Sequence, residues 1–295
     1  MHVAILGCGY VGLALATQLR ARGHEVTGVR RSEEGLRAVE DVGANPVRAD
    51  VTDPSSLGAV PDVDALVFAA SSGGRGAAAA RRVYVEGLRT TVKHFAGRAA
   101  PPDTLLYTSS TGVYGDHGGA WVDETTRPTP TTDKTAVLLE AEGVAQRATE
   151  HEIQPVVVRF GGLYGPDRYR LERYLEGPIT AGYLNLLHRA DAAGVLRFLL
   201  EKPSPPSVLL AVDTEPVDRR ELATWLADAC GVEAPMTQTV AERLAQDAVG
   251  DVTRRRLTTE KRCSNARLQE LGYSFEYPTY REGYAAAVDA YRDVH

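Results

Sequence analysis

Lysine and clustered basic residues are scarce in this chain of 295 residues, which has a formal net charge of -6 at pH 7. It has only four lysines, so arginine carries most of the positive charge, and the short arginine run at 254–256 is typical of a solvated surface. Nucleic-acid-binding surfaces are usually strongly basic. The composition therefore predicts no nucleic-acid partner.

Disulfides, metal-ligand spacing and long apolar runs are also missing. The three cysteines, Cys8, Cys230 and Cys263, lie far apart, and neither they nor the histidines have the spacing of a zinc site. This pattern predicts a reducing compartment and no bound metal. No apolar run is long enough to cross a membrane, and the N-terminus lacks the basic residues of a signal peptide, so we expect a cytoplasmic protein without a membrane partner.

The first residues of the chain contain its most informative motif. A short apolar strand runs into Gly-x-Gly-x-x-Gly at Gly7, Gly9 and Gly12, and a helical pattern follows. The first glycine permits a tight turn, the second lets the backbone approach a pyrophosphate, and the third allows close packing of helix on strand. The helix start, with Tyr10 and Val11, offers N–H groups to phosphates. The motif therefore predicts a dinucleotide site.

The end of the second predicted strand favours NADP over NAD. NAD enzymes of this architecture usually carry an acidic residue there, which accepts a hydrogen bond from the ribose 2′-hydroxyl. This chain has Arg30, Arg31 and Ser32 instead. Guanidinium groups bind a 2′-phosphate through charge-assisted hydrogen bonds, whereas a carboxylate would repel it. We predict NADP, with NAD as the alternative; in a third interpretation the two arginines are simply exposed loop residues.

The next two predicted strands complete the cofactor site. Asp50 and Val51 follow the third strand, where we expect contact with the adenine edge. Ala69 and Ala70 follow the fourth strand, where small side chains would let the ribose of a nicotinamide lie close.

Apolar runs that alternate with helical patterns predict the fold class. The expected strands lie at 3–6, 25–29, 46–49, 65–68, 104–109, 156–160 and 207–212, and the expected long helices at 11–22, 77–96, 133–149 and 191–200. Repeated βα units predict an α/β protein with a Rossmann-like, doubly wound parallel sheet.

The strand signals become sparse after residue 165, which predicts a second, smaller part of the chain. We expect a dinucleotide-binding domain at 1–165, to which 191–212 return, and a substrate-binding lobe at 166–190 and 213–295.

Four stretches carry a resemblance to a known family. They are the glycine motif and the segments 107–115, 159–166 and 185–191. Together they resemble the extended short-chain dehydrogenase/reductases of the NAD(P)-dependent epimerase/dehydratase type, and the tail at 261–265 and 277–283 is similar to an atypical branch of that superfamily. The resemblance implies hydride chemistry on a nicotinamide cofactor with a small hydroxylated or carbonyl substrate.

The family's catalytic pattern is only partly present. In typical members the fifth strand delivers a catalytic serine or threonine, which here corresponds to Ser110 or Thr111. The next helix then carries Tyr-x-x-x-Lys, in which lysine lowers the tyrosine pKa and the tyrosine exchanges a proton with the substrate. No lysine of this chain has a tyrosine four residues earlier. With the helix registered on Glu142, the tyrosine position falls on Lys134 and the lysine position on Leu138. With the helix registered on Glu140, they fall on Thr132 and Ala136.

Three other residues are candidates for catalysis. Tyr114 and Tyr164 could donate a proton, and a structural role is the alternative for both. Lys134 could contact ribose or substrate, or it could be a solvated helix start. The Asp-Glu pair that the family's dehydratases need after Thr111 is absent, so elimination from a nucleotide sugar lacks its residues.

Three functional interpretations stay open. The first is an NADP-dependent oxidoreductase or epimerase-like enzyme with an atypical active site. The second is a catalytically degenerate NADP(H)-binding sensor that regulates a partner, and the third is a scaffold without a ligand. Related proteins dimerise through two long helices of each subunit, so the resemblance also implies a homodimer formed by 77–96 and 133–149.

Overall fold

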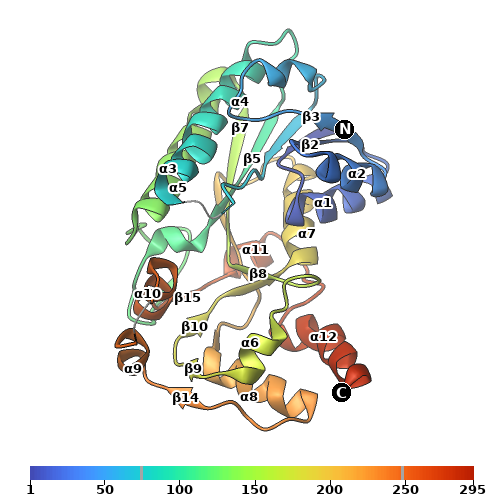
Figure 1. The fold of residues 1–295 in the computed structure, drawn as a ribbon. Helices are drawn as coiled ribbons and strands as arrows, with labels where there is room; N and C mark the ends of the chain where they lie inside the picture. The colour runs from blue at the N-terminus through green and yellow to red at the C-terminus, as the bar shows by residue number, and fades with distance from the viewer. Residues whose placement is uncertain (74–75, 247–248) are drawn as a thin grey trace. The chain divides into compact units, whose positions relative to one another are not determined.

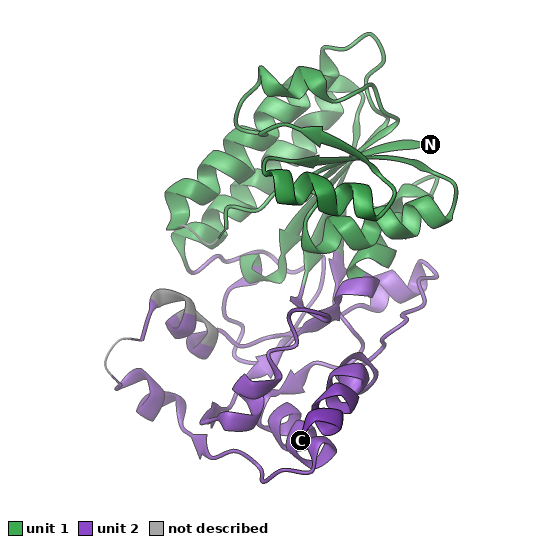
Figure 2. Cartoon of the chain, turned by 45° about the vertical axis from the view of Figure 1, so that its right-hand side comes forward, with its two compact units in different colours: residues 1–113, 132–160, 192–209 green, residues 114–131, 161–191, 210–295 purple. Residues whose placement is uncertain are grey.

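The computed structural model describes residues 1–73, 76–246 and 249–295, and the chain divides into two compact units (Figure 2). Unit 1 comprises 1–113, 132–160 and 192–209, and unit 2 comprises 114–131, 161–191 and 210–295.

Residues 114–131 belong to a different unit from the one that the sequence suggests. The sequence-based division places residues 114–131 in the dinucleotide-binding domain, whereas the structure groups them with unit 2. The reason is a short parallel ladder in which Trp121 pairs with Arg262 and Val122 with Cys263.

Unit 1 is built on a seven-stranded sheet with the order β12-β7-β5-β4-β1-β2-β3 (Figure 1). Its strands are β1 (His2–Leu6), β2 (Glu25–Arg30), β3 (Asn45–Arg48), β4 (Ala65–Phe68), β5 (Thr104–Ser110), β7 (Gln154–Phe160) and β12 (Val208–Ala211), the last at the boundary of the units. All neighbouring strands from β7 to β3 pair in parallel. The predicted α/β class with a Rossmann-like parallel sheet is confirmed.

Helices cover both faces of this sheet, which is why its central strands are continuous apolar runs. α1, α2 and α7 lie on one face and α3, α4 and α5 on the other (Figure 1). The helical elements are α1 (Tyr10–Ala21), α2 (Glu33–Asp41), η1 (Ser56–Ala59), α3 (Gly76–Ala80), η2 (Arg81–Gly87), α4 (Leu88–Ala96), η3 (Thr111–Tyr114), α5 (Asp133–Gln146), η4 (Arg147–His151) and α7 (Arg189–Leu200).

One helix of unit 1 is less regular than its apolar pattern suggests. The helix expected at 77–96 forms, but its middle, η2, is π-helical. A π stretch changes which side chains face the neighbouring elements, and such stretches are frequent at functional sites.

Unit 2 consists of short paired strands and helices around an aromatic core. Its strands are β6 (Trp121–Val122), β8 (Gly162–Tyr164), β9 (Ile179–Thr180), β10 (Tyr183–Leu184), β11 (Leu186–His188), β13 (Val217–Asp218), β14 (Thr237–Gln238) and β15 (Arg262–Cys263). Its helices are α6 (Leu171–Glu176), α8 (Arg219–Cys230), α9 (Val240–Leu244), α10 (Asp251–Thr258), α11 (Ala266–Glu270) and α12 (Tyr280–Val294). The core contains Tyr164, Tyr280 and Tyr284. Within the described part of the chain, no helix is both long enough and apolar enough to span a membrane.

Candidate dinucleotide site and active site

The glycine motif forms the turn between β1 and α1. Gly7 has a φ of 83°, and a Cβ at this position would overlap the backbone of Ala70. A Cβ at Gly12 would lie 3.0 Å from Ile5 Cγ2, so α1 packs closely on β1. The helix begins at Tyr10, and the first N–H groups of any helix lack intrahelical partners. This turn therefore has the backbone geometry that holds a pyrophosphate.

Arg30 lies directly beside this turn. A Cβ at Gly9 would come within 2.7 Å of Arg30 Nη1, and the same nitrogen donates a hydrogen bond to the Cys8 carbonyl at 3.0 Å. No ion pair among the described residues involves Arg30. Its positive charge is therefore not neutralised by a carboxylate. Burial raises the pKa of the Cys8 thiol to about 12, against the effect of Arg30, so this cysteine is a packed neutral thiol.

Two ion pairs occupy the adjacent ends of β2 and β3. Arg31 Nη1 lies 3.2 Å from Asp50 Oδ2, and Arg48 pairs with Glu33. Burial raises the pKa of Asp50, but hydrogen bonds from Thr52 and Arg31 lower it more, so the carboxylate stays ionised. Arg31 is therefore partly neutralised, in contrast to the arginine before it.

Ser32 follows β2, and Arg48 ends the neighbouring strand β3. The Ser32 hydroxyl accepts a hydrogen bond from Gly35 N at 3.2 Å and so caps α2. The sequence does not single out Arg48, which the β2–β3 register places opposite Arg30. That register is known only once the strands are paired.

The ends of β3 and β4 pack against their surroundings as small or buried residues. Ala69 N donates a hydrogen bond to the Leu6 carbonyl at 2.9 Å, and the backbone of Ala70 fills the space beside Gly7. Val51 is buried, and its Cγ2 lies 3.0 Å from the position of a Cβ at Gly87. These contacts bring the end of β4 next to the glycine turn.

Ser110 and Thr111 lie at the carboxyl end of β5, where the resemblance implies a catalytic hydroxyl. Ser110 Oγ accepts a hydrogen bond from Gly112 N at 3.1 Å, and Thr111 is buried at the start of η3. The geometry thus gives the serine hydroxyl a local backbone partner.

Its neighbour Ser109, which the sequence does not single out, belongs to a buried polar network. Ser109 Oγ donates to Glu142 Oε1 at 2.6 Å, and Arg159 donates to both carboxylate oxygens of Glu142 at 3.0 and 2.7 Å. The network links β5, α5 and β7 inside unit 1.

Lys134 is the second residue of α5, and its charge acts on a tyrosine that the sequence does not indicate. That residue is Tyr84 in η2, whose hydroxyl accepts hydrogen bonds from the backbone N–H and from the hydroxyl of Ser72, each at 3.3 Å. Tyr84 is far from Lys134 in the sequence, so no spacing rule could have paired them.

The two tyrosines that the sequence offers as proton donors both lie in unit 2. Tyr114 is fully buried, and its hydroxyl donates to the Asp123 carbonyl at 2.6 Å. Tyr164 stacks on Tyr284 with ring centroids 4.9 Å apart. Burial, with nearby carboxylates, raises the pKa of Tyr164 far above its usual value. Both surroundings favour a structural role.

Unit 2 also contains buried titratable groups. Asp191 accepts hydrogen bonds from the backbone N–H groups of Glu276 and Tyr277 at 2.9 and 2.8 Å. Asp213 is 1% exposed, its Oδ2 has no partner among the described residues, and burial raises its pKa to about 8. Burial lowers the pKa of His188 to about 4. Both Asp213 and His188 are therefore mainly neutral at pH 7.

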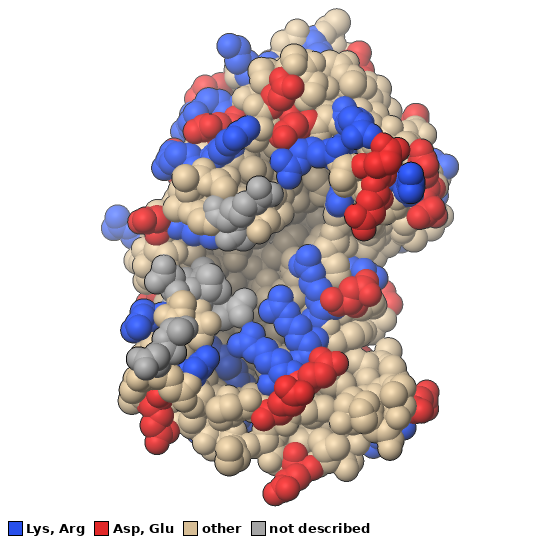
Figure 3. Space-filling view, in the orientation of Figure 1, with Lys and Arg blue, Asp and Glu red and all other residues tan. Residues whose placement is uncertain are grey.

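Basic side chains gather in the lower part of the face shown in Figure 3, where Figure 1 places α6 and β10 of unit 2. Arg219 donates to the Ala181 carbonyl at 2.7 Å, and Arg173 acts on it electrostatically. Arg262 lies over the Tyr183 ring, 5.2 Å from its centroid. This part of unit 2 therefore presents several guanidinium groups.

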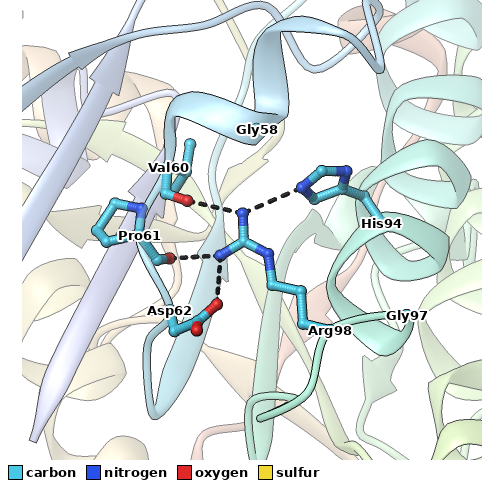
Figure 4. Close-up of a pocket in the computed structure, with 7 residues that line it drawn as sticks. All are labelled: Gly58, Val60, Pro61, Asp62, His94, Gly97 and Arg98. Carbon is cyan, nitrogen blue, oxygen red and sulfur yellow. Dashed lines mark hydrogen bonds and ion pairs between the residues drawn. The ribbon is translucent and has the colours of Figure 1, made fainter.

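A hollow in unit 1 lies at the amino ends of the strands, whereas the glycine turn lies at a carboxyl end (Figure 4). Its centre is filled by Arg98, which donates to the carbonyls of Val60 and Pro61 at 2.6 and 2.7 Å and to Asp62 at 3.0 Å. These residues precede β4 and β5, at the amino ends of the strands, whereas ligands of such sheets bind at the carboxyl ends. We interpret the hollow as an internal tie.

Comparison with known proteins gives a consistent family match. The model of the "NAD dependent epimerase/dehydratase family" matches residues 3–200. The Escherichia coli protein YeeZ is 28% identical over 284 residues, which cover 94% of this chain and 96% of YeeZ.

Solved structures have the same fold over nearly the whole chain. A protein from Methylobacillus flagellatus, assigned as an NAD-dependent epimerase/dehydratase, is 32% identical with a TM-score of 0.80 and covers 99% of this chain and 98% of its own. The Thermus thermophilus UDP-glucose 4-epimerase in complex with NAD has a TM-score of 0.77 at 20% identity, with 100% of both chains covered, and shows a likeness of fold alone.

Proposed function

Because this chain belongs to the NAD-dependent epimerase/dehydratase family, we propose that it is an oxidoreductase or epimerase-like enzyme that acts on a small hydroxylated or carbonyl compound. The observation that carries the proposal is the glycine turn, where Gly7 has a positive φ beside the Ala70 backbone and α1 begins at Tyr10, so that the turn forms a cradle for a pyrophosphate. A bound nicotinamide dinucleotide would supply the hydride chemistry.

The cofactor that fits best is NADP, with NAD as the alternative. Arg30 supports this preference, because its guanidinium lies at the glycine turn without a carboxylate partner among the described residues. Arg31 contributes less, since Asp50 shares its charge. The backbone at Gly7–Gly12, together with Ala69 and Ala70, would hold the rest of the dinucleotide.

Ser110 is the proposed residue that orients the reacting oxygen. Its position at the end of β5 supports this role, and its local hydrogen bond with Gly112 N would have to be shared with the substrate. Thr111 lies beside it as a second hydroxyl. Tyr114 and Tyr164 stay weaker candidates because of their buried surroundings.

Unit 2 is the proposed substrate-binding lobe, and its arginines favour a substrate with an acidic group. Arg173, Arg219 and Arg262 supply charge on the same unit, and guanidinium groups bind carboxylates and phosphates in a bidentate manner. A homodimer through the helices at 77–96 and 133–149, and a location in the cytoplasm, complete the proposal.

A second candidate function is an NADP(H) sensor without catalysis. The absence of Tyr-x-x-x-Lys favours it. Hydride exchange separates the two candidates: the protein is mixed with NADPH and a panel of aldehydes and ketones, and with NADP⁺ and a panel of sugars and secondary alcohols. The enzyme proposal predicts cofactor-dependent turnover of at least one compound. Tight cofactor binding without any turnover would instead support the sensor.

A further inference from the structure

Tyr84 occupies an unusual backbone setting for a tyrosine on a surface helix. It lies in the π-helical stretch η2, between the regular helices α3 and α4. Its ring is half-buried and packs against the main core of unit 1. Because a π stretch shifts the side chains that follow, it gives Tyr84 a direction that a regular helix would not.

The hydroxyl of Tyr84 is held by donors. Ser72, which is 6% exposed, donates from its backbone N–H and from its Oγ, each at 3.3 Å. Burial raises the pKa of Tyr84, but the hydrogen bonds from Ser72 and Ser71 and the charge of Lys134 lower it more, so the net shift is downward. Donors and a cation around a phenol oxygen favour its anionic form.

Tyr84 and its two partners, Ser72 and Lys134, lie near the carboxyl ends of β4 and β5. Ser72 follows β4, and Ser110 ends β5, which is the neighbouring strand in parallel register. Lys134 is in the first turn of α5, the helix that leads from this region back to β7. The carboxyl ends of such strands are where ligands bind in open α/β sheets.

Tyr107, whose phenol interacts electrostatically with that of Tyr84, is in a different state. Tyr107 is fully buried on β5, its hydroxyl has no hydrogen-bond partner among the described residues, and burial raises its pKa well above the usual value. Tyr84 and Glu142 raise it further. Of the two, only Tyr84 is both accessible and prepared to give up a proton.

We propose that Tyr84 is the proton-transferring residue of this enzyme, with Ser72 and Lys134 as the residues that position it and stabilise its phenolate. The proposal rests on the proposed function. Tyr84 on η2 and Lys134 on α5 would form a tyrosine–lysine pair, which typical members of the family carry on one helix.

In a reduction, Tyr84 would donate its phenolic proton to the carbonyl oxygen, and a bound reduced nicotinamide dinucleotide would supply a hydride to the carbonyl carbon. A new O–H bond and a C–H bond would then replace the C=O π bond. The O–H bond of Tyr84 breaks, and its phenolate, next to Lys134, regains a proton from solvent. Oxidation of an alcohol is the reverse.

The test uses the full chain without any substrate. Each tyrosine that ionises adds phenolate absorbance in the near ultraviolet, so a pH titration counts them in wild type, Tyr84→Phe, Lys134→Met and Tyr107→Phe. We expect wild type to contain one tyrosine that ionises below the usual value of about 10. Tyr84→Phe should lose this component, Lys134→Met should move it to higher pH, and Tyr107→Phe should keep it.

A second readout tests whether Tyr84 responds to the charge of a bound nicotinamide. The oxidised ring is cationic, so NADP⁺ binding should favour the phenolate and release protons at about one pH unit below the usual tyrosine pKa. Calorimetry in two buffers of different ionisation enthalpy measures this release. We expect it in wild type and Tyr107→Phe, and its loss in Tyr84→Phe with NADP⁺ still bound.

The outcomes separate the two proposals. Unchanged proton release in Tyr84→Phe, or a wild type without an early-ionising tyrosine, would overturn the role of Tyr84 and leave the cofactor site standing. Failure of wild type to bind either NADP⁺ or NAD⁺ would overturn the proposed function, and the role of Tyr84 with it. Circular dichroism of each variant excludes a loss of fold as the cause.

Discussion

The glycine turn and the start of α5 lie in the same unit, yet they preserve the family pattern very differently. The turn has all three glycines, and Gly7 is required by its positive φ and by the Ala70 backbone beside it. The α5 segment contains no Tyr-x-x-x-Lys. The residue at position 7 is thus constrained by backbone geometry. A proton donor, in contrast, only has to bring its hydroxyl close to the reacting oxygen.

This difference explains how a catalytic group could move within one fold. A turn with φ of 83° at Gly7 has few substitutes, since almost any side chain there would meet the Ala70 backbone. A phenol can be presented from any element whose side chains face the same edge. In this chain, η2 presents Tyr84 and α5 presents Lys134.

Tyr84 is the residue whose replacement we expect to change activity most. Replacement of Tyr84 by Phe should lower turnover by about 10²- to 10⁴-fold for any carbonyl compound that wild type reduces, because the proton donor is removed. The affinity for NADPH should be nearly unchanged. The measurement is steady-state NADPH oxidation, with Tyr107→Phe as the matched control. A fall in cofactor affinity that accounts for the whole loss would instead assign Tyr84 to binding.

The second largest effect that we expect is on stability, through the buried carboxylate of Glu142 on α5. Glu142→Gln should lower the free energy of unfolding by about 3–5 kcal/mol, because Arg159 is 5% exposed and would lose its anionic partner. Chemical denaturation measures this. Glu140→Gln, on the same helix, removes an exposed ion pair with Arg81 and should leave stability nearly unchanged. Equal effects of the two variants would mean that the buried network does not hold α5.

We expect a smaller effect on cofactor affinity when Arg30 is replaced. Arg30→Ala should weaken NADPH binding by about 10- to 100-fold, the value of a charge-assisted hydrogen bond, and change NADH binding much less. Arg37→Ala, an exposed arginine on α2, is the matched control. Calorimetric titration of both cofactors measures the difference. Parallel losses for NADPH and NADH would show that Arg30 supports the turn rather than the 2′-phosphate.

Much of the candidate dinucleotide site could be predicted from the sequence because each of its parts directly follows a strand. The glycine motif and the residues after β2, β3 and β4 follow from local rules that link a strand end to a ligand. Ser72 and Tyr84 could not be found in this way, because a π stretch and the packing of η2 on α5 bring them to Lys134. Ser109 was missed because its role depends on Glu142 and Arg159, which come from two other elements.

The fold of unit 2 was harder to predict for a similar reason. Its two-residue strands carry no period, and residues 114–131 join it only through pairing with a segment far along the chain. The helix α12 has a capping box at Thr279 and Glu282, a local signal that could have predicted its start.

The smallest expected effect lies in unit 2 and concerns pH. The folded state holds a proton on Asp213 up to about pH 8, above the unfolded value of about 3.9, so stability should fall as pH rises towards 8. The slope is at most about 1.4 kcal/mol per pH unit. Between pH 7 and 8, where His188 is mainly neutral in both states, Asp213→Asn should remove most of this slope. Denaturation at several pH values checks it, and an unchanged slope would assign the effect to other groups.

The most direct test of the account is a parallel calorimetric titration of wild type with NADPH and NADH. The account predicts that both bind at one site per chain and that NADPH binds at least about tenfold more tightly, because only NADPH offers a 2′-phosphate to Arg30. Equal affinity for the two cofactors would contradict the NADP preference. If neither cofactor binds, the glycine turn is not a working dinucleotide site.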